Sequence, residues 1–294
     1  MNLMKYKIAY FVFSLIIILP GLYFLLTSGL KLGIDFTGGA LLEYKIEGQV
    51  SREELWKIIS DQEVEVGQLI SSGENAYIIK TKPLETDKIN SIRKALVERF
   101  GKVEERRVEN VGPVIGNELK QKAIYALVTS SIAIVLYITF SFRKVPKPAS
   151  SWRFGIAAIV ALLHDVLLVV GIFAILGHFF KVEVDTLFVT ALLTVIGFSV
   201  HDTIVVFDRI RENLLKNMGK KFIDVANISI VQTLGRSLNT SLTVVFVLTA
   251  LLLFGGETIK WFVVALLIGI ISGTYSSIFN ATALLVWWEE KLGH

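Results

Sequence analysis

The sequence predicts a membrane α-helical bundle with six transmembrane helices plus one small α+β ferredoxin-like extracytoplasmic domain. A helix needs about 20 mostly apolar residues to cross the hydrocarbon core of a bilayer. Six stretches are that long and that apolar, far more than the core of one 294-residue soluble protein can bury. They cover roughly residues 8–30, 122–142, 153–177, 185–207, 238–256 and 260–287. The long polar stretch, residues 31–120, alternates strand-like and helix-like patterns and predicts the small domain.

Composition excludes several classes of site. Without cysteine the chain has no disulfide, thiolate metal site or cysteine nucleophile. The net charge of +4 is modest, so we predict no nucleic-acid binding. The basic start of the first stretch suits a signal peptide, but its apolar part exceeds the usual ~7–15 residues and no clear cleavage site follows. We therefore expect residues 1–30 to be an uncleaved first transmembrane helix.

Basic residues sort to one side of the predicted spans, where they flank the N-terminus and the loops after the second and fourth spans. These residues are Lys5, Lys7, Arg143, Lys144, Lys147, Arg153, Arg209, Arg211, Lys216, Lys220, Lys221 and Arg236. The other short loops carry only Lys181 and Lys260. Because positively charged loops stay inside, we expect both termini in the cytoplasm and residues 31–120 outside. Residues 121–294 then form a five-helix bundle with cytoplasmic loops.

The predicted small domain has the β-α-β-β-α-β order of ferredoxin-like folds. Its strands are expected at 41–47, 64–71, 75–82 and 103–108, and its helices at 51–60 and 86–100. Ser51 followed by Glu54 forms a capping box, and Gly101 stops the second helix. This fold implies no function by itself, and no catalytic triad, metal cluster or phosphate loop is evident. We expect contact with polypeptide or a partner subunit, with a passive spacer as the alternative.

Ionisable residues inside the spans are the strongest functional signal. Each costs roughly 2.5–3.5 kcal/mol at a helix centre, so it normally faces a partner or water. His164-Asp165 lies in the third span, His201-Asp202 in the fourth, and Arg236 at the entry to the fifth. Burial disfavours the charged carboxylate, whereas a nearby arginine favours it. The cluster therefore predicts a proton relay.

A structural ion pair that fixes helix packing is the alternative for this cluster. Arg236 could also be a topology anchor, and either histidine could simply bond a neighbouring helix. Three further features have plainer interpretations. Asp185 is expected to cap the fourth helix, residues 219–234 suit an interfacial helix, and small residues at four-residue spacing in the sixth span allow close helix approach.

Several motifs together resemble the SecF family of protein-export membrane proteins, within the resistance–nodulation–division superfamily. They are GIDFTGG at 33–39, VGPVIGNEL at 111–119, ALLHDV at 161–166, FSVHDTIVVFDRIREN at 198–213, QTLGRS at 232–237 and FGG at 254–256. The set spans nearly the whole chain. The first motif, which includes Asp35, Gly38 and Gly39, is shared with the sister SecD family. The short outer domain and His-Asp-Thr in the fourth span favour SecF.

The resemblance implies a SecD partner that completes a twelve-helix unit in the bacterial cytoplasmic membrane. That unit uses the proton-motive force to help draw unfolded preprotein through the SecYEG channel, which works with SecA. In the family, the residues matching Asp202 and Arg236 are tied to proton conduction, and Asp165 lies in a family motif. Protons and membrane lipid are further partners, and no cofactor or metal is expected.

Two other function classes compete with export. A small-molecule efflux transporter of the same superfamily would normally carry two large outside domains, and this chain has one small domain. A membrane-embedded enzyme, such as a protease, would need a catalytic motif. The chain has neither an H-E-x-x-H metal motif nor two aspartates in a catalytic arrangement.

Overall fold

The computed structural model describes residues 3–48, 50–71, 75–143 and 150–292. The chain divides into two compact units. Leu32–Ile124 form one unit, here called the small domain, and Met1–Lys31 with Tyr125–His294 form the other, here called the helical unit. The helix α5 (Pro113–Ser141) begins in the first and continues in the second.

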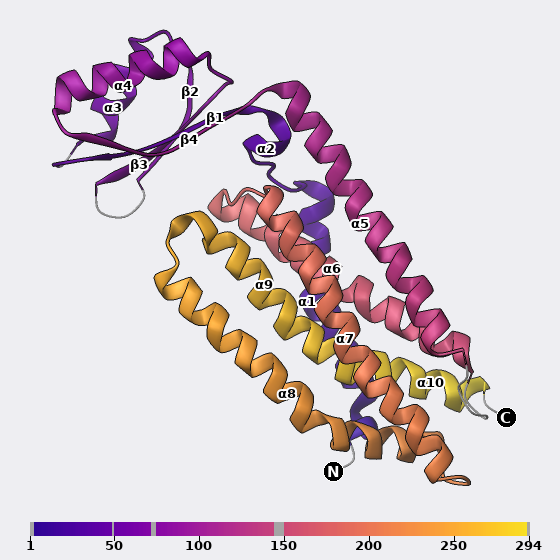
Figure 1. The fold of residues 1–294 in the computed structure, drawn as a ribbon. Coiled ribbons are helices and arrows are strands. Elements are labelled where there is room, and N and C mark those ends of the chain that lie inside the picture. The colour runs from indigo at the N-terminus through magenta and orange to yellow at the C-terminus, as the bar shows by residue number, and fades with distance from the viewer. Residues whose placement is uncertain (1–2, 49, 72–74, 144–149, 293–294) are drawn as a thin grey trace. The chain divides into compact units, whose positions relative to one another are not determined.

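The small domain is a four-stranded antiparallel sheet in the order β2-β3-β1-β4 with two helices against one face (Figure 1). Its strands are β1 (Gly39–Ile46), β2 (Val66–Ser71), β3 (Ala76–Thr81) and β4 (Val103–Val111), and its helices are α2 (Ile34–Thr37), α3 (Arg52–Ser60) and α4 (Thr86–Phe100). The predicted element order is confirmed. Leu42 lies opposite Ile79 on one side and Val108 on the other. Ser51 caps α3 as predicted, because its hydroxyl accepts the Glu54 amide at 3.1 Å. The Glu54 carboxylate bonds to Arg99 of α4, so only the Ser51 half of the predicted capping box is observed.

The core of the small domain contains a buried tyrosine, Tyr44. Tyr44 is fully buried in β1, and its hydroxyl finds no hydrogen bond among the described residues. Burial, assisted by the negative charge of Glu105, raises the pKa of Tyr44 to about 12. The same ring is packed among the inward-facing residues of the sheet and helices, including Leu55 and Ile92.

We expect Tyr44 to make folding pH-dependent under alkaline conditions. An unfolded tyrosine ionises near pH 10 and the folded one near 12. Stability is therefore complete below about pH 10 and declines as the pH rises through about 12. Tyr44→Phe should remove that decline and be neutral or stabilising by up to about 1 kcal/mol, since it deletes an unpaired buried hydroxyl. Denaturant unfolding at several alkaline pH values measures both effects.

Tyr77 provides the control for this prediction. Its hydroxyl donates to the Val50 carbonyl at 2.8 Å. Tyr77→Phe should therefore destabilise the domain by about 1 kcal/mol, because it leaves that carbonyl unpaired. An equal alkaline decline in wild type and Tyr44→Phe would show that Tyr44 is not the group responsible.

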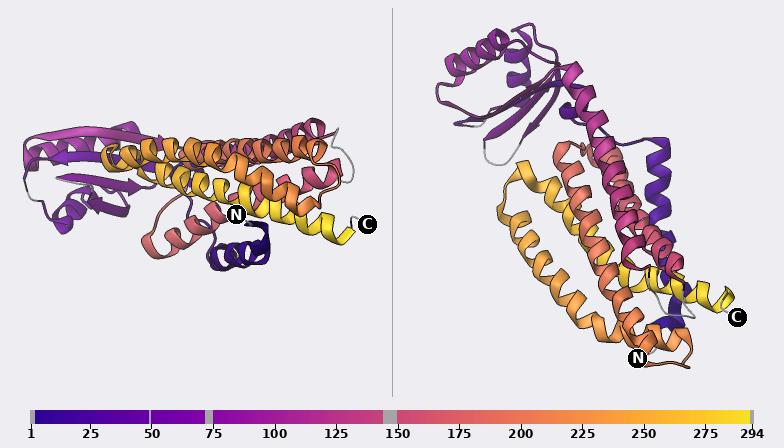
Figure 2. Two further views of the ribbon diagram at one scale, coloured as in Figure 1. Left: turned by 90° about the horizontal axis from the view of Figure 1, so that it is seen from below. Right: turned by 45° about the vertical axis from the view of Figure 1, so that its right-hand side comes forward.

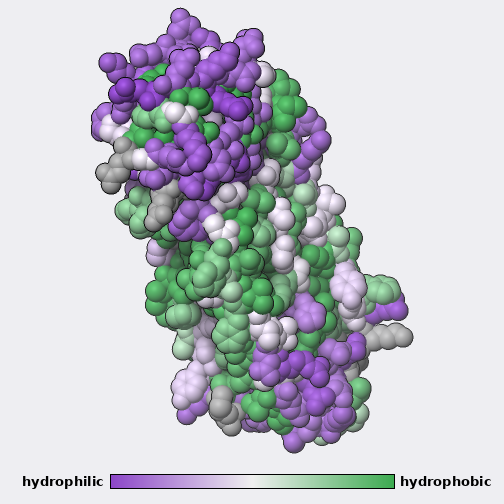
Figure 3. Space-filling model, turned by 60° about the vertical axis from the view of Figure 1, so that its left-hand side comes forward, coloured by the Kyte–Doolittle hydropathy of each residue, from purple (hydrophilic) through white to green (hydrophobic). Residues whose placement is uncertain are grey.

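The helical unit contains helices long and apolar enough for six membrane spans, as predicted. They are α1 (Lys7–Thr27) with the short helix η1 (Leu3–Tyr6), α5, α6 (Ser151–Phe180), α7 (Thr186–Lys216), α8 (Phe222–Phe254), and a sixth span made of α9 (Glu257–Tyr275), η2 (Ser276–Ala281) and α10 (Thr282–Leu292). The helices α8 and α9 run side by side in Figures 1 and 2. The face drawn in Figure 3 is largely apolar over this unit, as contact with lipid requires.

One sequence prediction here is wrong. Residues 219–234 do not form a separate interfacial helix, because α8 runs unbroken from Phe222 to Phe254. The apolar residues at its start face the bundle: Val225, Ala226 and Ile230 are buried in the main core of the unit. The helical spacing of these residues was predicted correctly, but the same helix continues without a break into the fifth span.

Glycines set the closest helix contacts. A Cβ on Gly21 of α1 would lie 2.7 Å from the Gly171 backbone of α6. A Cβ on Gly269 of α9 would lie 2.2 Å from Val195 of α7. The small residues of the sixth span therefore do permit close helix approach, as their four-residue spacing predicts.

Candidate functional site

Asp165, on α6, lies at the centre of a buried ring of hydrogen-bond donors. It is 1% exposed. Its Oδ2 accepts hydrogen bonds from the Ser199 and Ser276 hydroxyls, both at 2.6 Å. Its Oδ1 accepts one from Ser272 at 2.7 Å and lies 3.0 Å from His164 Nδ1. Because the donors come from α6, α7, α9 and η2, Asp165 joins three membrane spans.

A second set of hydroxyls continues this polar layer along α7. Ser277 of η2 donates to the Ser199 carbonyl at 3.0 Å. Thr203, one turn further along α7, lies 2.8 Å from the same Ser277 hydroxyl. Gly273 allows this approach, because a Cβ there would lie 3.2 Å from that of Ser199. Ser199 and Thr203, one turn apart on α7, thus meet Gly273 and Ser277, which are one turn apart on the sixth span.

Asp202, three residues after Ser199 on α7, is equally buried but much less well bonded. It is 1% exposed, and its Oδ2 has no hydrogen-bond partner among the described residues. Its electrostatic neighbours are His201, Thr274 of α9 and Ser241 of α8. The two hydroxyls lie 2.5 Å apart. Asp202 therefore faces the junction of α7, α8 and α9.

The hydroxyls beside Asp202 have alternative acceptors. Ser241 can donate to the Ser237 carbonyl at 2.9 Å, and Thr274 to the Ile270 carbonyl at 2.9 Å. Each hydroxyl carries one hydrogen, so it can serve either its own helix or a neighbour. The Ser237 hydroxyl, one turn from Ser241, is also buried and unpaired within the described part of the chain. Among the described residues, this junction thus holds two polar groups without a hydrogen-bond partner, Asp202 Oδ2 and the Ser237 hydroxyl, and two hydroxyls with alternative acceptors.

The two histidines of the predicted relay have different surroundings. His164 is mostly buried, with a side chain 10% exposed, and its Nε2 has no partner among the residues described. His201 is exposed, and its Nδ1 lies 3.7 Å from Asp202 Oδ1. Of the two, His201 is the one that solvent or another subunit could reach.

The structure does not bring Arg236 to Asp202. Arg236 lies on the exposed side of α8, and no ion pair joins its guanidinium to any residue described. The helix rotation explains this, because the next residue, Ser237, and Ser241 face inward and are buried. On the outward side, Arg236 is followed by Asn239, Thr240 and Thr243, all exposed.

The predicted motif outside the membrane joins two elements of the small domain. Asp35 lies in α2, and Gly38 and Gly39 have φ values of +76° and +149°, which side chains rarely adopt. A Cβ on Gly38 would also lie 3.0 Å from Pro113, where α5 begins. The motif therefore requires glycine for backbone packing between β1 and α5.

Asp185 caps the fourth transmembrane helix, as predicted. Its carboxylate accepts the Phe188 amide at 2.9 Å and caps α7.

Sequence reasoning did not single out Ser272, Ser276 or Thr274. The signal was present, since Ser272 and Ser276 are polar residues four apart in an apolar span. Their region contains the π-helical segment η2, and π-bulges in α-helices are frequent at functional sites. No pattern in one sequence indicates that both serines face Asp165, more than 100 residues away.

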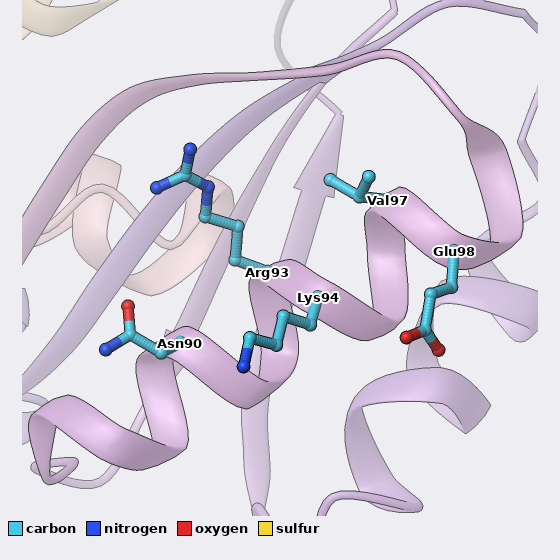
Figure 4. Close-up of a pocket in the computed structure, with 5 residues that line it drawn as sticks. All are labelled: Asn90, Arg93, Lys94, Val97 and Glu98. Atoms are coloured by element: carbon cyan, nitrogen blue, oxygen red, sulfur yellow. The ribbon is translucent and has the colours of Figure 1, made fainter.

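The pocket shown in Figure 4 lies elsewhere, on the small domain. It is an open groove along one face of α4, lined by Asn90, Arg93, Lys94, Val97 and Glu98. All five residues come from one helix, and Figure 4 shows their side chains diverging from it. The groove has the character of a solvated helix face and contains none of the predicted relay residues.

Comparison with known proteins agrees with the predicted family. Residues 91–291 match the family described as protein export membrane protein SecD/SecF, C-terminal, and residues 23–50 match the SecD/SecF GG motif. The chain is 51% identical to the protein translocase subunit SecF of Thermobaculum terrenum, covering 99% of this chain and 94% of that protein. It is 35% identical to the protein translocase subunit SecDF of Bacillus subtilis, covering 96% of this chain but 37% of the relative.

Solved structures give the same assignment. The crystal structure of SecDF from Thermus thermophilus superposes with a TM-score of 0.85 at 32% identity, covering 99% of this chain and 39% of that one. SecDF in a super-membrane-facing form gives a TM-score of 0.70 at 31% identity, with the same coverage. The chain thus corresponds to about two fifths of the fused proteins and to nearly the full length of the separate SecF subunits. It is a multi-pass membrane protein and belongs to the SecD/SecF family of protein-export membrane proteins.

Proposed function

We propose that this chain is a SecF-type subunit which, with SecD, couples proton movement to preprotein export, and that Asp202 carries the proton. The observation behind this proposal is the unpaired, buried Oδ2 of Asp202. An ionised carboxylate with an unbonded oxygen is costly inside a bilayer. A proton on that oxygen removes the charge and creates a donor that neighbouring hydroxyls can accept.

Proton binding at Asp202 would change the bonding between three helices. When the carboxylate is charged, Ser241 and Thr274 can both donate to it. When it is protonated, it donates, and the two hydroxyls can return their hydrogens to the carbonyls of Ser237 and Ile270. The contact of α7 with α8 and α9 then differs between the two states. The membrane potential supplies about 2.3 kcal/mol per charge per 100 mV to drive such a cycle.

The exposed polar stripe on α8 supports a membrane partner. Arg236, Asn239, Thr240 and Thr243 are exposed on this chain alone. Polar groups facing lipid are costly, so such a stripe normally faces another protein surface or water. SecD is the partner proposed here, and the fused SecDF relatives carry a region matching this chain within one longer polypeptide.

Sidedness follows from the charge distribution of the loops. We propose a location in the bacterial cytoplasmic membrane with both termini in the cytoplasm. The small domain would then lie outside, where it could meet unfolded preprotein leaving the SecYEG channel, which works with SecA on the inner side. This assignment gives the chain no enzymatic activity of its own.

Reconstitution tests the proposal. The chain would be copurified with the SecD-like protein of the same cell and placed in vesicles containing a pH-sensitive dye. Imposing a membrane potential should drive proton uptake that requires both subunits and increases in the presence of SecYEG, SecA and a preprotein. Proton uptake no faster than in protein-free vesicles, with the complex intact, would contradict the proposal.

Arg236 should be required for proton movement and not only for topology. We expect Arg236→Ala to reduce proton uptake at least about tenfold, equivalent to about 1.4 kcal/mol. Arg236→Lys separates the two roles, because lysine anchors topology equally well but cannot reproduce the planar, multidentate guanidinium. Full activity of Arg236→Ala in correctly oriented vesicles would leave Arg236 as a topology anchor.

A further inference from the structure

We propose that Asp165 is a positioning residue and not the proton carrier: its hydrogen bonds anchor the sixth span so that Thr274 faces Asp202. This inference rests on the proposed function, since it concerns the same proton site. It gives different roles to Asp165 and Asp202, which the sequence places in one proton relay. Both are 1% exposed, so the difference between them lies in their bonding.

Each oxygen of Asp165 already accepts two hydrogen bonds. Ser199 and Ser276 bond to Oδ2, and Ser272 and His164 bond to Oδ1. Charge-assisted bonds of this length are the strong ones. A proton on either oxygen would displace one of these donors. Asp202 offers the opposite arrangement, with one oxygen open.

The groups that face Asp165 do not provide an alternative proton site. The neighbouring titratable group is His164, whose ring lies 6.5 Å from that of Tyr275. His164 Nδ1 must carry hydrogen to bond to Asp165. Its Nε2 is buried and meets no partner in the described residues, so a second proton there would find no acceptor. No lysine or arginine pairs with Asp165 within the described ranges, and its carboxylate is held by three serine hydroxyls and His164.

The anchor acts on Asp202 through the sixth span. Ser272 and Ser276, which bond to Asp165, flank Thr274 by two residues on each side. Thr274 faces the other way and lies 2.5 Å from Ser241, beside Asp202. A Cβ at Gly273 would lie 3.5 Å from Asp165 Oδ2, so the backbone itself rests against the carboxylate. Releasing Asp165 would let this segment rotate and remove Thr274 from the proton site.

The same anchor supports the π-helical segment. Ser276, its first residue, is bonded to Asp165, and Ser277 is bonded to the Ser199 carbonyl. A π-turn lacks the regular α-helical bonding, so side-chain bonds at its start hold it in place. The hydrogen bonds of Asp165 and Ser277 thus hold α7 and η2 together on one side of the proton site.

Infrared titration of the SecD-containing complex distinguishes an anchor from a carrier, because a carboxylic acid and a carboxylate absorb differently. We expect the protonated-carboxyl absorption to contain a component that titrates with pH in wild type, is absent in Asp202→Asn, and persists in Asp165→Asn. Loss of this component in Asp165→Asn, together with its retention in Asp202→Asn, would make Asp165 the carrier and overturn the inference. The Asp202→Asn sample tests the proposed function separately, since its result does not depend on Asp165.

The positioning role predicts a second readout. Ser272→Ala with Ser276→Ala keeps the Asp165 carboxylate and removes two of its donors. Alanine is small and favours helix, so the fold should be kept. We expect the double variant to shift the pH midpoint of proton uptake by about one unit or more. Ser130→Ala with Ser131→Ala, on α5, is the matched control, because those hydroxyls bond only to the Leu127 carbonyl of their own helix. An unchanged pH midpoint in the Ser272→Ala, Ser276→Ala double variant would overturn the inference.

Discussion

Asp202→Asn should abolish proton uptake while leaving the bundle folded and assembled. Asparagine has the shape of aspartate but cannot exchange a proton, so no charge can be carried at this position. Its amide oxygen can still accept a hydrogen bond from Ser241 or Thr274, which preserves the packing of α7 against α8 and α9. Export that depends on the proton gradient should fall to the level seen without SecD and SecF.

Proton uptake in vesicles and copurification with SecD measure the two halves of this prediction. Asp185→Asn is the matched control, since it makes the same substitution on the same helix. Asp185 caps α7 through the Phe188 amide, and asparagine caps as well as aspartate. Wild-type proton uptake by Asp202→Asn, or an equal loss in both variants, would contradict the assignment of Asp202 as carrier.

The sequence predicted the elements of this fold well where the physical signal is local. The helix Thr86–Phe100 was predicted at its observed bounds, because its amphipathic spacing ends at Gly101. The helix α5 was predicted to begin near 122 but begins at Pro113. Its first ten residues mix apolar side chains with Asn117, Glu118, Lys120, Gln121 and Lys122 and so lie before the apolar run, and Pro is well suited to a first helical position. An apolar window therefore marks the membrane span and not the whole helix.

The same limit applies to the candidate site. A lone carboxylate in an apolar span is conspicuous, so Asp165 and Asp202 could be singled out from sequence. Their partners could not, because the serines that bond to Asp165 lie 34, 107 and 111 residues away. Helix rotation was also hidden: Arg236 and Ser237 are neighbours in sequence but face opposite sides of α8. The sequence does not tell a carboxylate with hydrogen bonds to both oxygens, such as Asp165, from one with an unbonded oxygen, such as Asp202. That distinction requires the three-dimensional structure.

Glu289→Ala should be among the most destabilising single substitutions in the helical unit. Glu289 on α10 bonds to Arg153 on α6 at 2.8 Å, and the two side chains are 2% and 14% exposed. The Glu289 carboxylate also faces the Ser150 amide at 3.4 Å. Removing one member of a buried pair leaves the other charge uncompensated, which typically costs about 3–5 kcal/mol. Unfolding in mixed micelles that contain increasing amounts of a denaturing detergent measures this loss of stability.

An exposed pair on the same span supplies the control. Glu257 bonds to Lys260 at 3.0 Å, and their side chains are 54% and 39% exposed. Exposed pairs contribute about 0–1 kcal/mol, so Glu257→Ala should change stability little. The two substitutions remove the same side chain from the sixth span and differ in burial, and therefore similar losses would show that burial of the Arg153 pair is not the cause.

The double variant Arg153→Met with Glu289→Met tests the physical origin of the effect. If the loss in Glu289→Ala comes from an unpaired buried arginine, then replacing both charges with apolar side chains should recover most of it. The flanking rings of Trp152 and Trp288, 4.8 Å apart, already provide an apolar setting for the two methionines. If the double variant were as unstable as Glu289→Ala, the ion pair would have to contribute more than the desolvation of its charges costs. It would then stabilise the contact between the third and sixth spans directly.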